Sequence, residues 1–582
     1  MKFLLIGINS KYIHSNPAIH SLKEYAGTAY ADSIELAEYT INNPEDEILA
    51  DIYKRNPDVI GISCYIWNFN MVQELLEELP KILPGRDIWL GGPEVSFEGE
   101  PVLKKYPMVT GIMVGEGEET FRELVEYYMQ NEKAGISVPQ NINGLLLREG
   151  FTGSREELSL DALPFLYENL EEYQNRIIYY ETSRGCPFQC IYCLSSVENK
   201  VRLRSMDKVK RELQHFLDRK VPQVKFVDRT FNCNREHAME IWRYIKDHDN
   251  GVTNFHFEVA ADIMTPEQIA ILSDMRPGLV QLEIGIQTTN DKTLHEINRY
   301  VNTAHIAHVV AALREKENVH IHLDLIAGLP FEDYESFGHS FDEVYGMEPE
   351  QLQLGFLKVL KGSPMFYLAD KYGVVYQSKP PYEVLYTNWL SYGDVLKLKQ
   401  IEEMVELYYN SNQYRATLRV LRENFASPFA MFETLAQYYA GKGYFVNTPA
   451  RSYRYQVLLD FVCEVDKEKK ELYRELLTYD YYLRENAKSR PSFAKDLSEH
   501  HEKIWEFYQK EEKEPVFLPD YRDYHAKQTL KMTHIEVFTY PVWEKKAERI
   551  CEKSENPQFM LFDYQVRNPL NQDARTVLIL QS

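Results

Sequence analysis

Short apolar runs alternate with helical segments along the N-terminal part of the chain. The runs cover 3–8, 58–63, 88–91 and 111–114, and a helical pattern over 71–79 meets Pro80. Because proline breaks a helix interior, we expect that helix to end there. Strands that alternate with helices are typical of a doubly wound parallel sheet, whose ligands bind at the carboxyl ends of the strands. We therefore predict an α/β fold whose first domain, 1–135, is flavodoxin-like or Rossmann-like.

The carboxyl ends of these predicted strands carry small residues. Ser63 ends one strand and the pair Gly91-Gly92 ends another. Glycine lets the backbone approach a bulky flat ligand or another loop. Glu118 and Glu119 start the next helical segment, where acidic residues favour the helix dipole. A ligand site at Ser63, Gly91 and Gly92 is therefore expected, with a purely structural cap as the alternative.

Six further strand-like runs, separated by helical segments, begin after residue 176. They cover 177–183, 223–230, 254–262, 279–287, 319–328 and 351–359. Repeated strand-helix units of this length build a TIM-like barrel, and six units instead of eight leave it open on one side. We predict a partial (β/α)6 barrel over 176–370. A linker over 136–175, rich in turn residues, joins it to the first domain.

The barrel strands alternate apolar and polar positions, so each strand has one polar face. Helices cover the outside of a parallel barrel, so the polar faces should line the lumen as a binding cavity. Each histidine taken alone is better explained as a hydrogen-bonded lumen residue than as a catalytic one. The polar positions are Asn254, His256, Glu258, Gln281, Glu283, Gln287, His320, His322, Asp324, Gln351 and Gln353.

The pattern changes beyond the barrel, over 371–582. Amphipathic helical segments rich in tyrosine and charge cover 395–409 and 467–483, and strand-like runs cover 535–540, 558–564 and 576–580. Clustered tyrosines are more often core residues than ligand contacts. We predict a mostly helical C-terminal domain with a small β appendage that closes the barrel or shapes access to it.

Three of the seven cysteines, Cys186, Cys190 and Cys193, form a C-x3-C-x2-C motif just after the first barrel strand. Three thiolates so close can hold one metal centre. Iron-sulfur clusters normally take four thiolates, so three would leave one iron open to a cofactor or substrate. A zinc site completed by a histidine or a distant cysteine is the alternative.

The composition narrows the range of partners. The formal net charge is −23, so nucleic acid is not an expected partner. Seven cysteines make no disulfide framework for a chain of 582 residues. Neither a signal peptide nor a long apolar run is evident, so we expect a cytoplasmic protein without a membrane span.

The cysteine motif within a six-unit barrel resembles the radical SAM superfamily, and further segments resemble its cobalamin-associated branch. Those segments are 226–231, 283–288, 296–299 and 324–330. The resemblance implies that Cys186, Cys190 and Cys193 hold a [4Fe-4S] cluster whose open iron binds S-adenosylmethionine (SAM). It also implies cofactor contacts along the barrel. Tyr192 would lie by the adenine, Asp228 near the methionine amine, and Glu283 or Gln287 near the ribose, with Glu258 completing the cofactor-binding set.

The first domain resembles the cobalamin-binding domain found ahead of many radical SAM barrels. Ser63, Gly91 and Gly92 fall where that family has its serine and glycine elements. The histidine-ligating motif of other cobalamin domains is absent, because Tyr12 and Pro17 replace its Asp and Gly around His14. Cobalamin would therefore bind without a histidine ligand, or the domain has lost the cofactor.

These resemblances imply an enzyme that cleaves SAM to a 5'-deoxyadenosyl radical and methylates carbon with the help of cobalamin. It would act on a small molecule or peptide and take electrons from flavodoxin or ferredoxin. The alternatives are a radical rearrangement, cyclisation or oxidation without methyl transfer, and a non-enzymatic iron-sulfur sensor or scaffold. The C-terminal domain resembles an uncharacterised extension of some cobalamin-associated members.

Overall fold

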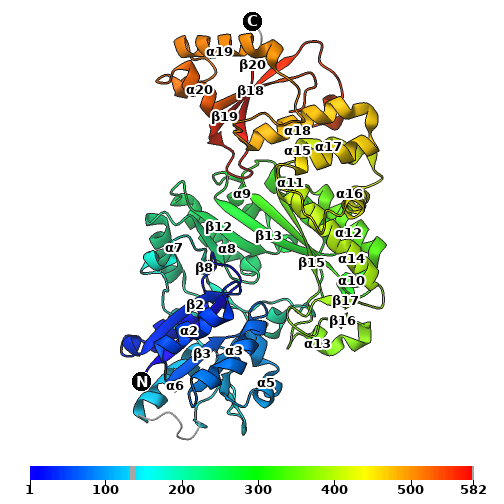
Figure 1. Ribbon diagram of the computed structural model, residues 1–582. Coiled ribbons are helices and arrows are strands. Elements are labelled where there is room, and N and C mark those ends of the chain that lie inside the picture. Colours follow the sequence, from blue (N-terminus) through cyan, green and yellow to red (C-terminus); the bar gives the residue numbers. More distant parts are fainter. Residues whose placement is uncertain (132–138, 580–582) are drawn as a thin grey trace.

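The computed structural model describes residues 1–131 and 139–579, which form three successive parts. In Figure 1 the blue first domain and the orange and red C-terminal elements lie at opposite ends, with the green barrel strands between them. The α/β architecture predicted from the sequence is confirmed. The predicted boundary between 135 and 136 lies outside the described residues.

The first domain is built on a seven-stranded sheet in the order β2-β1-β3-β4-β5-β6-β7. Its first five strands are parallel, and β6 and β7 are added antiparallel. Both added strands lie in the stretch predicted as linker, so the sheet extends further than expected. The strands are β1 (Phe3–Asn9), β2 (Ile34–Thr40), β3 (Val59–Ser63), β4 (Asp87–Gly91), β5 (Val109–Met113), β6 (Leu145–Leu147) and β7 (Gly150–Phe151).

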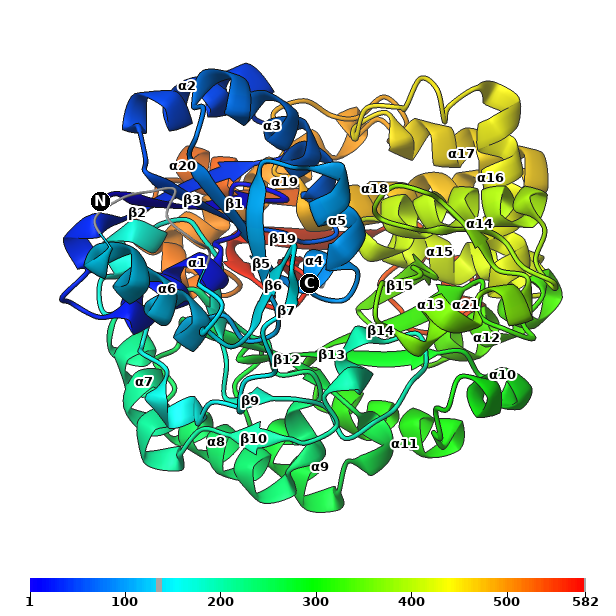
Figure 2. The same ribbon diagram turned by 90° about the horizontal axis from the view of Figure 1, so that it is seen from below.

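Helices cover both faces of this sheet. One core contains residues of α2, α3, α4 and α5, and the other contains residues of α1 and α6. Figure 2 shows α2 and α3 on one side of β1 and β3, and α1 and α6 on the other. The helices are α1 (Pro17–Ala26), α2 (Glu45–Arg55), α3 (Phe69–Ile82), α4 (Pro93–Ser96), α5 (Gly99–Lys105) and α6 (Glu118–Gln130).

The prediction that the third helix ends before Pro80 is wrong, because α3 contains Pro80 and continues to Ile82. Proline removes one backbone donor and crowds the carbonyl four residues earlier. So close to the end of the helix, this disturbs a single turn. The buried face of α3 still runs from Phe69 to Leu79.

The second part is an open sheet of six parallel strands in the order β15-β14-β13-β12-β11-β8. Its members follow one another in the sequence, as expected for a partial barrel. The strands are β8 (Ile178–Tyr180), β11 (Gln223–Phe226), β12 (Asn254–Val259), β13 (Val280–Gln287), β14 (His320–Ala327) and β15 (Gln351–Phe356). The helices between them are α7 (Met206–Asp218), α8 (Arg235–Asp247), α9 (Pro266–Ser273), α10 (Asp291–Glu296), α11 (Thr303–Arg314) and α12 (Tyr334–Gly346).

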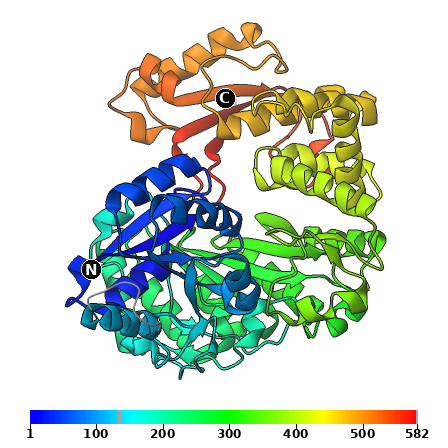
Figure 3. The same cartoon turned by 60° about the horizontal axis from the view of Figure 1, so that its bottom comes forward.

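The third part is mostly helical and packs on the late barrel elements. Figure 3 shows its yellow helices between the green strands and the orange and red C-terminal elements. A three-stranded antiparallel sheet forms the predicted β appendage. The main elements are α13 (Pro364–Leu368), β16 (Val375–Tyr376), β17 (Val384–Tyr386), α14 (Tyr392–Met404), a π-helical turn (Val405–Asn410), α15 (Arg415–Leu421), α16 (Pro428–Lys442), α17 (Arg454–Val465), α18 (Lys470–Arg484), α19 (His501–Lys513), α20 (Ala526–Met532), β18 (Thr533–Phe538), α21 (Ala547–Ile550), β19 (Gln558–Arg567) and β20 (Ala574–Ile579).

Candidate active site

The cysteine loop begins after a short strand, β9 (Ser183–Arg184), which pairs antiparallel with β10 (Arg202–Leu203). Gly185 follows at φ +92°, and a Cβ there would lie 2.2 Å from the carbonyl oxygen of Lys200. This turn therefore requires glycine. Cys186 and Cys190 are buried, Cys193 is half-buried, and all three thiols are free.

Backbone hydrogen bonds fix the loop to two later segments. The Ile191 N–H donates to the Ile297 carbonyl at 3.0 Å, and the Met365 N–H donates to the Ile191 carbonyl at 2.8 Å. The Asn298 side chain donates to the Gln189 carbonyl at 3.0 Å. The loop is thus held by the segment after α10 and by the start of α13.

Arg299 extends from the same segment toward the cysteines. Its guanidinium donates to Cys190 Sγ at 3.6 Å and to the Tyr192 hydroxyl at 3.5 Å, and it also contacts the Gly285 carbonyl. Hydrogen bonds to ligand sulfurs tune iron-sulfur centres. The sequence motif pointed to this segment, but Arg299 was not among the predicted site residues.

All three cysteines line one cavity of about 200 Å³ at the carboxyl ends of the barrel strands. Among the described residues, no three Cys, His, Asp or Glu side chains are already gathered at a site for a single metal ion. The donor set of three free thiols suits an iron-sulfur cluster. Gln287 Oε1 and Arg299 Nε are buried without a partner, which leaves polar atoms for a ligand such as SAM.

The predicted residues Tyr192, Glu258, Glu283 and Gln287 line this cavity, and Asp324 joins them. Burial raises the pKa of Glu258 to about 7. Burial would also raise the pKa of Glu283, but its hydrogen bond with His256 and the charge of Lys225 lower it to about 2. Near neutral pH Glu283 is therefore ionised, whereas Glu258 is close to its midpoint between the protonated and ionised forms.

Gln287 has φ +74°, in the left-handed region that non-glycine residues seldom adopt. The pairing of β13 with β14 shifts register between Gly285 and Gln287. Beside β13, His322 Nε2 and Asp324 Oδ1 lie 3.1 Å apart, but neither atom makes a well-aligned hydrogen bond among the described residues. Strained backbone and unsatisfied polar atoms are typical of functional sites.

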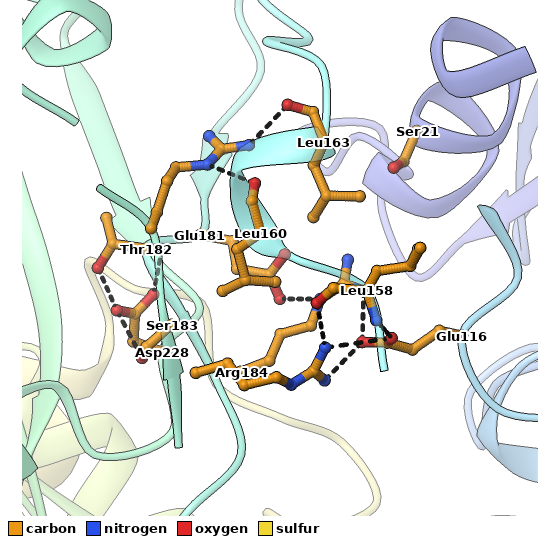
Figure 4. A network of polar contacts seen from close by, with 12 residues as sticks. Ser21, Glu116, Leu158, Leu160, Leu163, Glu181, Thr182, Ser183, Arg184 and Asp228 are labelled. Atoms are coloured by element: carbon orange, nitrogen blue, oxygen red, sulfur yellow. Dashed lines mark hydrogen bonds and ion pairs between the residues drawn. The ribbon is translucent and has the colours of Figure 1, made fainter. Parts of the chain in front are cut away.

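Asp228 lies beside the start of the cysteine loop. It lines neither this cavity nor the second cavity that is described next. Its carboxylate accepts hydrogen bonds from the Thr182 N–H at 2.8 Å and from the Ser183 hydroxyl at 2.9 Å, as Figure 4 shows. Burial raises its pKa to about 6, although these hydrogen bonds oppose the shift. Asp228 thus fixes the start of the loop, and its contact with SAM stays a prediction.

A second cavity, of about 540 Å³, lies between the first domain and the barrel. Ser63, Gly91 and Gly92 line it, as predicted for the first domain's ligand site. Gly92 has φ +108°, and a Cβ there would lie 2.5 Å from the Cys64 carbonyl oxygen. The glycine backbone leaves room for a bulky ring to approach, so this wall is compatible with a corrin.

No histidine of the described residues lines this second cavity. His14 instead places its Nδ1 2.5 Å from the Tyr179 hydroxyl on β8. Ser63 is used within the domain, because its hydroxyl donates to the Ile6 carbonyl and accepts from Asn16. The walls therefore favour a corrin held without a histidine ligand.

Ion pairs join the cysteine loop to the first domain. Arg184 contacts Glu116 at 2.8 Å and Glu118 at 2.7 Å, and Arg202 contacts Glu116 at 2.6 Å. Figure 4 shows Arg184 reaching the Glu116 carboxylate. Burial would raise the pKa of Glu116, but the hydrogen bonds from the two arginines lower it to about 2. Glu118, interpreted from the sequence as a helix-start acid, thus also pairs with the barrel.

The two cavities share wall residues. Ser195 and Arg229 line both of them, so the space beside the cysteines borders the space beside Gly91 and Gly92. Ser195 comes from the turn after Cys193, and Arg229 comes from the turn that follows β11. A molecule at this junction can touch both spaces.

Three family models match this chain. The B12 binding domain matches residues 4–125, the Radical SAM superfamily matches 180–344, and the protein of unknown function DUF4080 matches 370–562. The radical SAM match implies a [4Fe-4S] cluster and SAM as cofactors, and the B12 match implies cobalamin. Among the described residues, no helix has the length and apolar character needed to cross a bilayer.

Three curated relatives illustrate the sequence similarity. The 2-(S-pantetheinyl)-carbapenam-3-carboxylate methyltransferase of Streptantibioticus cattleyicolor is 25% identical over 48% of this chain and 44% of its own length. The cobalamin-dependent radical SAM methyltransferase TokK of Streptomyces tokunonensis is 23% identical over 53% and 48%. An anaerobic magnesium-protoporphyrin IX monomethyl ester cyclase of Cereibacter sphaeroides is 22% identical over 60% and 58%. The chain spans about half the length of these relatives.

Two solved structures share the fold at low sequence identity. The cobalamin-dependent SAM radical enzyme OxsB with aqua-cobalamin bound has a TM-score of 0.55 at 14% identity, covering 83% of this chain and 79% of that one. The radical SAM methyltransferase TsrM from Kitasatospora setae has a TM-score of 0.52 at 14% identity, covering 65% and 76%. Together with the family matches, these similarities identify an enzyme. The chain therefore carries a B12-binding domain and a radical SAM domain, the combination found in the cobalamin-associated branch of radical SAM enzymes, and it continues into a DUF4080 domain.

Proposed function

We propose that this enzyme is a cobalamin-dependent radical SAM methyltransferase that adds a methyl group to an unactivated carbon of a small molecule or peptide. When bound, the cluster and SAM supply one-electron bond cleavage, and cobalamin supplies a transferable methyl group. The shared wall of the two cavities at Ser195 and Arg229 is the observation that carries this proposal. A substrate at that junction would lie against both cofactor spaces, as methyl transfer requires.

Each group of site residues would have its own role. Cys186, Cys190 and Cys193 would hold the cluster, and Arg299 would orient Cys190 through its 3.6 Å contact. Asp228 would hold the start of the loop through its hydrogen bonds to Thr182 and Ser183. Tyr192, Glu258, Glu283 and Gln287 would bind SAM, while Ser63, Gly91 and Gly92 would form the wall behind the corrin. The protonated form of Glu258 would donate a hydrogen bond and Glu283 would accept one.

An external reductant is also needed, because none of these side chains supplies an electron at low potential. Flavodoxin or ferredoxin is the class of partner that we propose. Enclosure between the first domain and the barrel would keep water from reactive species.

The test is anaerobic reconstitution of the full chain with iron, sulfide and hydroxocobalamin, followed by reduction in the presence of SAM labelled in its methyl group. We expect 5'-deoxyadenosine, a bound-cobalamin absorption spectrum, and label in a product from a metabolite extract. An intact cluster that forms no 5'-deoxyadenosine would rule out the radical reaction. A Gly92→Val variant should distort the cavity wall, because its Cβ would meet the Cys64 carbonyl oxygen, and we expect it to lose cobalamin and keep the cluster.

The similarity to a cyclase makes a radical reaction without methyl transfer the second candidate. It shares the cysteine loop and the SAM contacts and differs in the fate of the methyl group. If 5'-deoxyadenosine and a new product form while the methyl label is recovered only in SAM and in the released methionine, the second candidate replaces the first.

A further inference from the structure

The arginines that line the two cavities differ in one respect. Arg184 is paired with three glutamates, Arg204 with Glu212, and Arg299 with Gly285 and Cys190. Arg229 lines both cavities, yet its guanidinium has no hydrogen-bond or ion-pair partner among the described residues. It is exposed. Of the described cations that line these spaces, it alone is left free.

The backbone around Arg229 is fixed on both sides. Asp228 is buried and hydrogen-bonded to the start of the cysteine loop. Thr230 places its hydroxyl 3.4 Å from Cys186 Sγ. The position of Arg229 is therefore set by residues that also set the loop. Its side chain leaves from a rigid point between the two cofactor spaces.

The acids near Arg229 form no ion pair with it, although its charge acts on Glu258 and lowers the pKa of that carboxyl against the effect of burial. Glu258 shares the cysteine cavity with Arg229, but the two groups form no ion pair, and Glu283 is already paired with Lys225 and His256. In a chain of net charge −23, acids suitable for pairing are plentiful. The guanidinium of Arg229 is therefore available to bind a ligand at this junction.

We propose that Arg229 binds an anionic group of the substrate, a carboxylate or a phosphate, and so holds the reacting carbon between the two cofactor spaces. This inference rests on the proposed function for the placement of the substrate at the junction. The guanidinium offers a planar fork of donors that matches carboxylate or phosphate oxygens in pairs. The substrate class is therefore anionic.

The first test uses inorganic phosphate and acetate as probes on the full chain loaded with cluster and cobalamin. Phenylglyoxal modifies accessible arginines, and peptide mass spectrometry gives the rate at each one. Phosphate at about ten times its dissociation constant should slow modification of Arg229 about tenfold. Arg243, an exposed arginine on α8 without a side-chain partner among the described residues, is the control and should be unaffected. Chloride at equal ionic strength corrects for screening.

Two results of this first test would overturn the inference. One is equal modification of Arg229 in phosphate, acetate and chloride. The other is full protection by SAM alone, with nothing added by phosphate, which would assign the guanidinium to the carboxylate of SAM.

The second test compares Arg229→Gln and Arg229→Lys with Arg243→Gln. Losing a charge-assisted hydrogen bond should lower label transfer to the anion-exchange-retained fraction of a metabolite extract about 10- to 100-fold in Arg229→Gln. Arg229→Lys should retain part of it. The concentration of SAM that half-saturates 5'-deoxyadenosine formation should stay within about twofold. A variant that loses SAM binding, or transfers label normally, contradicts the inference. Normal 5'-deoxyadenosine formation without anion protection would leave the proposed function standing and remove only the anion site.

Discussion

At the scale of single residues, the cysteine loop depends on side chains from distant parts of the chain. Asp228 binds Thr182 from below, and Arg299 contacts Cys190 from the side. Both groups are more than forty positions away from their partners, at separations of 46 and 109 residues. The loop is therefore preorganised by the barrel, and each cysteine can be tested separately from its support.

Cys190→Ala should abolish cluster binding, because two thiols cannot hold a cluster that is normally held by at least three. Iron and sulfide content after anaerobic reconstitution, with the visible absorption of the cluster, measures this. Cys551→Ala is the matched control, since Cys551 is an exposed free cysteine outside the loop. Full cluster content in Cys190→Ala would place the ligands elsewhere.

The spacing of residues within the sequence predicted part of this site. The C-x3-C-x2-C motif located the loop, and strand alternation brought Glu258 and Glu283 to the same cavity. Asp228 does not follow this alternation, because it has the parity of the buried positions Val224 and Phe226. Thr182 and Ser183 bind its carboxylate, and their approach follows from the pairing of β11 with β8. Arg229 and Arg299 were missed because an unpaired or sulfur-directed guanidinium cannot be recognised before its neighbours are known.

At the scale of elements, strands with a clear pattern of apolar positions could be predicted, and β2, an edge strand without such a pattern, could not. In β2 only Ile34 and Ala37 are buried, so its sequence lacks the run that marked the other strands. The barrel strands were located within a few residues because their buried apolar positions alternate with polar positions along each strand. The edge of β15 is protected by a side chain from another element, which the sequence did not indicate.

Asn410, at the end of the π-helical turn, pairs with this edge. Its side chain accepts from the Leu352 N–H at 2.9 Å and donates to the Leu352 carbonyl at 2.9 Å, as a neighbouring strand would. Edge strands are commonly protected in such ways. The contact also fixes the C-terminal domain to the barrel.

Asn410→Ala should speed hydrogen exchange at the Leu352 N–H about 5- to 100-fold. The substitution leaves the Leu352 N–H and carbonyl without partners, which lowers the free energy that protects them by about 1–3 kcal/mol. Mass spectrometry of a peptide spanning β15 measures this. Ser411→Ala, next in the chain, is the control and should exchange like the parent. Unchanged exchange in Asn410→Ala would mean that packing alone protects the edge.

At the scale of the whole molecule, the sequence predicted the order of three domains and their fold classes, but not how they contact one another. The patterns of apolar positions report each domain's own core. The interface is polar and rests on Arg184, Arg202 and Glu116, which come from segments that no periodicity connects. The location of the shared cavity wall followed only from this arrangement.

Glu116 makes the contact between first domain and barrel sensitive to acid. Its pKa is about 2 in the folded chain and 4.5 when unperturbed, so the folded state favours the charged form. A depressed carboxyl pKa stabilises the fold above the unperturbed value, and this stabilisation disappears as pH falls toward the folded value. Glu116 therefore contributes up to about 3 kcal/mol to the free energy of unfolding above pH 4.5. This contribution is lost as pH falls from there toward 2.

Glu116→Gln removes the charge and should destabilise the apo chain at pH 7, with a lower unfolding temperature by calorimetry. The difference from the parent should shrink as pH falls below 4.5, since the parent then loses the same charge by protonation. Other carboxyls titrate in this range, so the quantity measured is the difference between the two chains at each pH. Glu100→Gln, at an exposed position on α5, should follow the parent throughout. A difference that stays constant from pH 7 to pH 3 would show that Glu116 acts through packing and hydrogen bonds that its neutral form keeps.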